Sequence, residues 1–185
     1  MNPPPDIVKI RVNKLAANIV GNALGLLLCV GGIVLAHHLP HFSPRISTGR
    51  FFAFVGYLAA LVPLHEGLHA AGLMVFGRVA WRDLRFGIMW RALMPYCHCT
   101  VPITLHAYRR MAIAPLVVTG AIAIGWLLLI PHDLTGLTAG LTLATCVGDV
   151  WMVLKLRGFA DQLRVQDCPS DVGCDLLPPA PAPES

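Results

Sequence analysis

The chain has 185 residues, of which 56% are hydrophobic and only 13% are charged. Soluble domains carry about 25% charged residues, so this composition argues against a soluble enzyme. The formal net charge is +4, but the basic residues lie at the edges of apolar segments and do not alternate with aromatic side chains. This pattern excludes nucleic acid as a partner and indicates a lipid bilayer as the surroundings of the protein.

Four apolar segments are each long enough to cross a membrane once, which takes about 20 mostly apolar residues. They cover residues 15–36, 51–76, 111–130 and 134–154. We therefore predict an all-α integral membrane protein with four transmembrane helices in a single domain, residues 15–157. A cleaved signal peptide is the alternative for the first segment, but that segment is longer than a usual signal sequence core.

Basic residues near membrane spans concentrate on the cytoplasmic side. When the N-terminus is placed inside, only Arg45 and Arg50 of the 14 Lys and Arg residues lie outside. We therefore predict a multi-pass protein of the cell (inner or plasma) membrane with both termini cytoplasmic. Residues 1–14 and the tail, residues 158–185, are then cytoplasmic, and the Pro- and Ala-rich end is expected to be disordered from about residue 178.

The long segment between the second and third spans alternates apolar and other residues at 84–91 and again at 96–101. A period of two is typical of strands, so we expect a short β-hairpin-like cytoplasmic loop. The six cysteines of the chain lie in spans or on the reducing side of the membrane, and free thiols are expected. A zinc site made of cysteines at 97, 99, 168 and 174 is an alternative, although their spacing is not C-x-x-C.

The second span contains the sequence His65-Glu66-Gly67-Leu68-His69. Side chains at positions i and i+4 share one face of a helix, so the two imidazoles are spaced to hold one Zn²⁺. Glu66 can then reach water at the ion and act as a general base without binding the metal. Placing an ionisable residue at bilayer depth costs about 2.5–3.5 kcal/mol. A metal site would explain why three such residues are present in this span despite that cost. The alternative is a hydrogen-bonded His-Glu-His cluster that packs the bundle.

A catalytic zinc site usually has three protein ligands and an open position for water. Asp149 is the only other acidic residue inside a predicted span, and it lies about 10 Å below the cytoplasmic surface, at the depth of His69. A ridge of small residues precedes it at four-residue spacing and lets a neighbouring helix approach closely. The ridge consists of Gly136, Gly140, Ala144 and Gly148. We predict Asp149 as the third metal ligand, with a structural aspartate as the alternative.

These motifs resemble a bacterial family described as putative zincin peptidases. The shared features are the HExxH motif, Tyr96-Cys97-His98 in the basic loop, Pro115 in the third span, an aspartate in the last span and Asp167-Cys168-Pro169. The family is distantly similar to the site-2 proteases, which are intramembrane zinc metalloproteases. The resemblance implies a zinc site on one helix that an aspartate on another helix completes. In the site-2 proteases a glycine follows this aspartate, whereas here Gly148 precedes Asp149.

We predict an intramembrane metalloprotease in which zinc-activated water hydrolyses peptide bonds and Glu66 is the general base. His98 is expected to reach the site from the loop and stabilise the oxyanion, with a surface histidine as the alternative. The substrate would be a membrane protein or a peptide, and the sequence does not indicate an oligomeric state. A second hypothesis is a non-catalytic metal-binding membrane protein with a structural or partner-binding role. A haem or di-iron oxidoreductase is disfavoured because the chain has one histidine motif.

Overall fold

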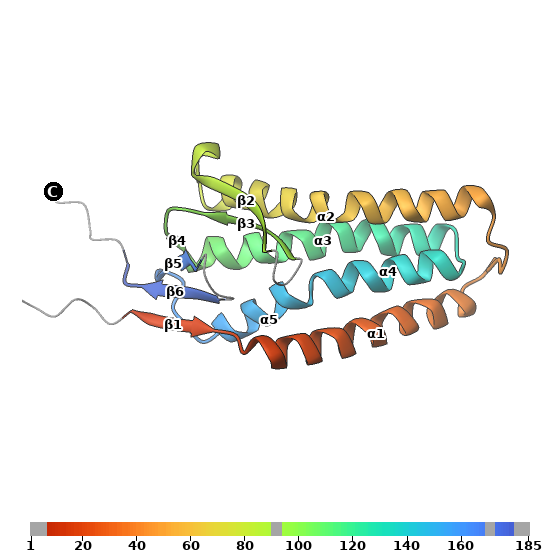
Figure 1. The fold of residues 1–185 in the computed structure, drawn as a ribbon, viewed down its shortest axis with the longest axis horizontal. Helices are drawn as coiled ribbons and strands as arrows, with labels where there is room; N and C mark the ends of the chain where they lie inside the picture. The colour runs from red at the N-terminus through yellow and green to blue at the C-terminus, as the bar shows by residue number, and fades with distance from the viewer. Residues whose placement is uncertain (1–6, 90–93, 169–172, 180–185) are drawn as a thin grey trace, which may run out of the picture.

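The computed structural model describes residues 7–89, 94–168 and 173–179. Most of these residues are helical. The helices are α1 (Lys14–His38), α2 (Thr48–Phe76), α3 (Leu105–Leu129), α4 (Asp133–Thr145) and α5 (Val147–Leu156), with a short 3₁₀ helix at Trp81–Asp83. They lie along the long axis of the molecule, and the strands gather at one end of the bundle (Figure 1).

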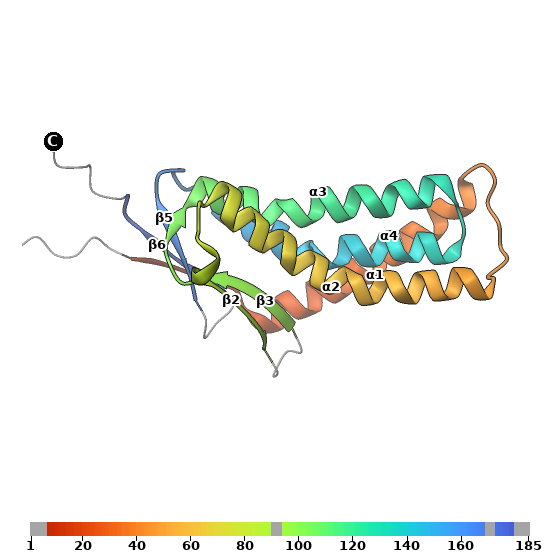
Figure 2. The ribbon, with the colours of Figure 1, turned by 90° about the horizontal axis from the view of Figure 1, so that it is seen from above.

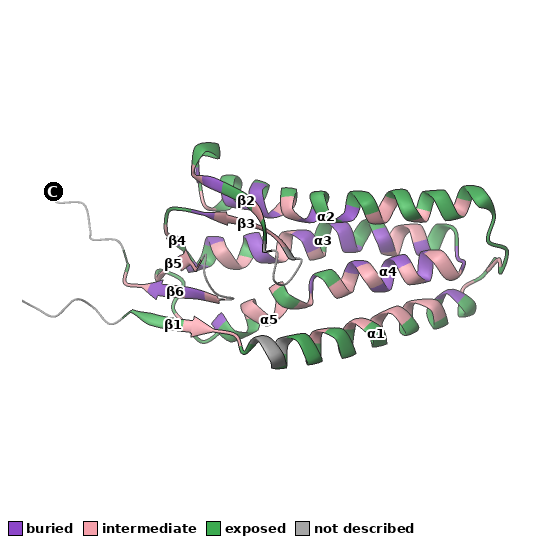
Figure 3. Ribbon diagram, in the orientation of Figure 1, coloured by how far each residue is buried: buried purple, intermediate pink, exposed green. Residues whose placement is uncertain are grey.

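Four helical segments are long and apolar enough to cross a membrane, α4 and α5 together forming the fourth. Large apolar side chains on their outer faces are exposed: Leu26 is 68% exposed, Val75 69% and Leu129 83%. Helix α1 shows mainly exposed and half-buried residues, whereas buried residues gather on α2, α3 and α4 (Figure 3). Apolar exposure of this extent is typical of a surface that faces lipid, which supports the predicted membrane protein.

Small residues bring α1 and α4 into close contact. A Cβ atom added to Gly136 would lie 2.5 Å from the Gly32 carbonyl oxygen, and one added to Gly140 would lie 2.4 Å from the Cys29 Cα atom. Both distances are shorter than any real contact of a Cβ atom, so these positions require glycine. Two members of the predicted ridge therefore form the contact between these helices, as expected for membrane helices that associate through small residues.

The predicted hairpin is confirmed. Strands β2 (Leu84–Met89) and β3 (Met94–Cys99) pair antiparallel and form a two-stranded sheet. In the view of Figure 2 this hairpin lies beside α2, near the end of the bundle that carries the other strands. The connection between the two strands, residues 90–93, lies outside the described residues.

The all-α prediction is corrected by a second sheet of four antiparallel strands. Its order is β1 (Val8–Arg11), β6 (Gly173–Leu177), β5 (Arg164–Asp167) and β4 (Ile103–Thr104). Each strand has only two to five residues, too few for an alternation of apolar residues to be diagnostic. The pairing of β1 with β6 also joins opposite ends of the chain, a contact that local sequence patterns do not encode.

This four-stranded sheet covers the end of the bundle where α3 begins and α5 ends. Leu105 and Leu156 are fully buried there, against Val165, Cys174 and Leu176 of the strands. Part of the predicted cytoplasmic tail is therefore packed structure. The predicted disorder from about residue 178 falls mainly on residues 180–185, which lie outside the described part of the chain.

Candidate metal centre

Helix α2 presents both histidines of the HExxH motif to the interior of the bundle. His65 and His69 are each only 8% exposed, and their Nε2 atoms lie 3.1 Å apart. The Nδ1 atom of His69 lies 3.4 Å from the Met111 carbonyl oxygen of α3, which orients the second ring. The predicted spacing on one helix face is therefore observed in three dimensions.

Asp149, in the first turn of α5, reaches the same point from the opposite side. Its Oδ2 atom lies 3.2 Å from His65 Nε2, and its Oδ1 atom lies 3.5 Å from His69 Nε2. Donors that are each about 2.0–2.1 Å from a tetrahedral zinc ion lie about 3.3–3.4 Å from one another. The three observed separations are close to this value, so the side chains are spaced as zinc ligands.

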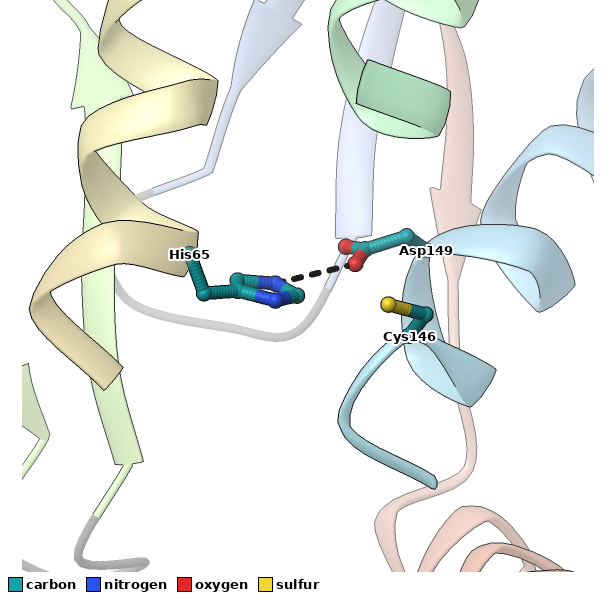
Figure 4. Close-up of side chains that lie close together, drawn as sticks. All are labelled: His65, Cys146 and Asp149. Atoms are coloured by element: carbon teal, nitrogen blue, oxygen red, sulfur yellow. Dashed lines mark ion pairs between the residues drawn. The ribbon is translucent and has the colours of Figure 1, made fainter. Parts of the chain in front are cut away.

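A fourth donor, Cys146, was not predicted. The side chains of His65, Cys146 and Asp149 offer ligand atoms that all lie within 4.8 Å of one another. Figure 4 shows the thiol and the carboxylate pointing from neighbouring turns toward the His65 ring. The sequence signal was the i, i+3 spacing of Cys146 and Asp149, which places both on one helix face, but Cys146 was interpreted only as a free thiol of a span.

The hydrogen bonding of these side chains is incomplete. Among the described residues, His65 Nδ1 is buried without a hydrogen-bond partner, and Asp149 Oδ2 has only the ion pair with His65 Nε2. Buried polar atoms are almost always satisfied, and an exception calls for an explanation such as an ion. Two imidazoles, a carboxylate and a thiol are the donors that zinc prefers. The donor set and the incomplete hydrogen bonding at the site thus both fit a zinc ion.

A cavity of about 440 Å³ opens beside these donors. Its lining includes the two histidines and Asp149 together with Glu66, Pro95, Tyr96, Cys97 and Thr145. Glu66 is half-buried and interacts with the backbone of Cys97 in β3. The predicted base and the predicted ligands therefore face one cavity, and the hairpin forms part of its wall.

His98 is in a different position from the other predicted site residues. It lies on β3 opposite Arg85, and its ring stacks on Tyr96 with centroids 5.2 Å apart. Tyr96 lines the cavity, whereas His98 is not among the described residues that line it. The structure thus brings together His65, Glu66, His69 and Asp149. His98 lies outside this group, behind Tyr96, on which its ring stacks.

A second, smaller cavity of about 90 Å³ lies against His69 and Asp149, and Tyr108 and Asp167 contribute to its lining. Asp167 belongs to β5, and its Oδ2 atom accepts a hydrogen bond from the Cys99 backbone N–H at 3.3 Å. Burial raises the pKa of Asp167, a change that the hydrogen bond from Cys99 opposes. Asp167 was part of the resemblance to the zincin peptidases but was not predicted as a site residue, because it lies in the predicted cytoplasmic tail.

A family model described as "Putative zincin peptidase" matches residues 58–163, which is more than half of the chain. The chain belongs to this zincin peptidase family. The matched region contains the HExxH motif, the hairpin, Cys146 and Asp149, and membership implies zinc as the cofactor. Searches of curated proteins and of solved structures found no match.

Proposed function

We propose that this zincin-family protein is an intramembrane zinc metalloprotease. The observation that carries the proposal is the approach of Asp149 to within 3.2 and 3.5 Å of the two HExxH imidazoles, beside a cavity that also contains Glu66. His65, His69 and Asp149 would hold the zinc ion. When bound, zinc acidifies water and polarises a peptide carbonyl.

Glu66 is the proposed general base. It is adjacent to His65 in the chain and lines the cavity that a peptide would enter, so its carboxylate can take the proton that water gives up and pass it to the leaving amine. His98 remains our candidate for stabilising the oxyanion, through movement of the ring that now stacks on Tyr96. Loss of one oxyanion donor typically lowers kcat by about 10²–10³, which His98→Gln would test.

We place the protein in the cell membrane with both termini cytoplasmic and with a membrane protein or a peptide as its substrate. The excess of basic residues at the ends of spans supports this orientation. The pairing of β1 with β6 supports it further, because it brings the first and last strands to the same end of the bundle. The cavity beside Glu66 would then open toward the cytoplasmic half of the bilayer.

The test is zinc content and peptide cleavage by the detergent-purified protein. We expect Glu66→Gln to retain zinc and to lose cleavage, because it removes the base and leaves the ligands intact. Asp149→Ala should lose zinc, with affinity falling by at least about 100-fold, since even partners of metal ligands contribute 10–100-fold. Asp83→Ala, a carboxylate change in the 3₁₀ helix outside the site, is the matched control and should retain both.

The alternative, a metal-binding protein without catalysis, has one observation in its favour: Cys146 offers a fourth protein donor, and structural zinc sites are closed by four such ligands. The same experiment separates the two functions. Zinc-loaded wild type that cleaves neither soluble nor membrane-anchored peptides would favour the non-catalytic role. Cleavage that survives Glu66→Gln would contradict the proposed mechanism.

A further inference from the structure

Cys146 lies at the break between α4 and α5. Its backbone N–H donates to the Leu143 carbonyl at 3.2 Å, so the Thr142 carbonyl lacks the bond that a continuous helix would supply from residue 146. The thiol of Cys146 donates to this carbonyl instead, with Sγ 3.5 Å from the oxygen. Cys146 is 1% exposed, so the thiol is buried inside the protein beside the candidate metal centre.

The thiol can leave this hydrogen bond at little cost. Thr145 Oγ1 also donates to the Thr142 carbonyl, at 2.7 Å, and this stronger bond would remain if Sγ turned away. A thiol is only a weak hydrogen-bond donor. Two positions are therefore open to Cys146 Sγ, one on the Thr142 carbonyl and one toward His65 and Asp149, whose ligand atoms already lie within 4.8 Å.

We propose that Cys146 is a fourth zinc ligand that closes the metal centre at rest. The inference rests on the proposed zinc site of His65, His69 and Asp149. Thiolate is a preferred zinc ligand, and its binding would release the thiol proton to solvent. A zinc ion with four protein ligands has no position for water, so the closed site is hydrolytically silent. Hydrolysis requires the Cys146 thiolate to leave the ion, to take up a proton from solvent and to donate again to the Thr142 carbonyl.

The deciding measurement is zinc K-edge X-ray absorption on the zinc-loaded full chain in detergent. We expect one sulfur at about 2.3 Å from the ion in the wild type and in Cys29→Ser, the matched control, which changes a cysteine of α1 outside the proposed ligand set. Cys146→Ser should show only nitrogen and oxygen ligands. A wild-type spectrum without sulfur overturns the proposal, and this outcome does not depend on the folding of any variant.

Two further readouts extend the test. The cobalt-substituted wild type and Cys29→Ser should show a thiolate-to-cobalt charge-transfer band in the near ultraviolet, and Cys146→Ser should lack it. Zinc affinity of Cys146→Ser should fall by at least about 10-fold, the lower end of the effect of losing a mere partner of a ligand, while its peptide cleavage at saturating zinc should rise above that of the wild type. Cleavage that stays unchanged or falls would overturn the closure at rest.

These outcomes separate the inference from the proposed function. Zinc bound without sulfur, together with cleavage that depends on Glu66, would overturn the role of Cys146 and leave the protease intact. Sulfur-bound zinc without cleavage in either the wild type or Cys146→Ser would overturn the protease and the closure at rest. A wild type that binds neither zinc nor cobalt would overturn both proposals.

Discussion

Two buried imidazole nitrogens, the Nε2 atoms of His65 and His69, lie 3.1 Å apart and cannot both be satisfied by a single proton. If both Nε2 atoms of His65 and His69 present lone pairs to each other they repel, and if one carries a proton it can satisfy only one partner. The carboxylate of Asp149 lies within 3.5 Å of both. A cation at the centre would be attracted by every one of these atoms, so a metal ion resolves the arrangement more completely than a proton does.

A histidine far from this site should make stability depend on pH. His132 caps α4. Its ring Nδ1 atom accepts a hydrogen bond from the Thr135 backbone N–H at 3.2 Å, and the His132 backbone N–H donates to Thr135 Oγ1 at 3.1 Å. Burial, and next the positive charge of Arg50, lower the pKa of His132. Only the neutral ring can accept the bond, so folding favours the neutral form.

The sign of the pH effect follows from this lowered pKa. As pH falls below about 6.5, the unfolded chain binds the proton first. The contribution of His132 to the free energy of unfolding is therefore complete above that pH. It declines as the pH falls from there to the folded-state pKa. Between about pH 7.5 and pH 5.5 we expect the wild type to lose more thermal stability than His132→Asn, which keeps a capping side chain that does not titrate. Equal losses in thermal melts would contradict this assignment.

At the scale of elements, the contact between α1 and α4 depends on the absence of side chains. A Cβ atom on Gly32 would lie 2.2 Å from the Gly136 carbonyl oxygen, whereas one on the adjacent Gly31 would have no neighbour within 4 Å. Overpacking of this kind costs about 1–3 kcal/mol. Gly32→Ala should therefore lower the thermal midpoint in detergent, while Gly31→Ala, the matched control, should leave it unchanged or raise it. Similar midpoints for the two variants would contradict the packing.

The elements also show what sequence patterns can and cannot predict. Long apolar segments predicted the helices because each pattern extends over 20 or more residues. The depth of Asp149, which matches that of His69, predicted its approach to the histidines because both helices cross the same membrane. The strands β1, β4, β5 and β6 were not predicted because their stability comes from pairing with one another and not from any local pattern. Cys146 was not predicted as a donor because it was placed inside one continuous span, and the residue at this helix break is neither proline nor glycine.

At the scale of the whole molecule, the candidate metal centre joins segments that lie far apart in the chain. His65 and His69 belong to α2, whereas Cys146 and Asp149 lie where α4 gives way to α5. An ion held by both segments restrains their relative movement, and its binding energy adds to the energy of folding when the unfolded chain binds it weakly. Zinc should therefore stabilise the entire bundle and not only its site.

The size of this effect can be estimated. At a zinc concentration about 100 times Kd, binding adds about 2.7 kcal/mol to the stability of the folded state, which corresponds to a rise of roughly 5–10 °C in Tm for a chain of this length. We expect this rise for the wild type in detergent and its loss in Asp149→Ala. Mg²⁺, which prefers oxygen ligands, should have no effect. A zinc-induced rise that persists in Asp149→Ala would contradict the assignment of Asp149 as a ligand that joins α5 to the histidines of α2.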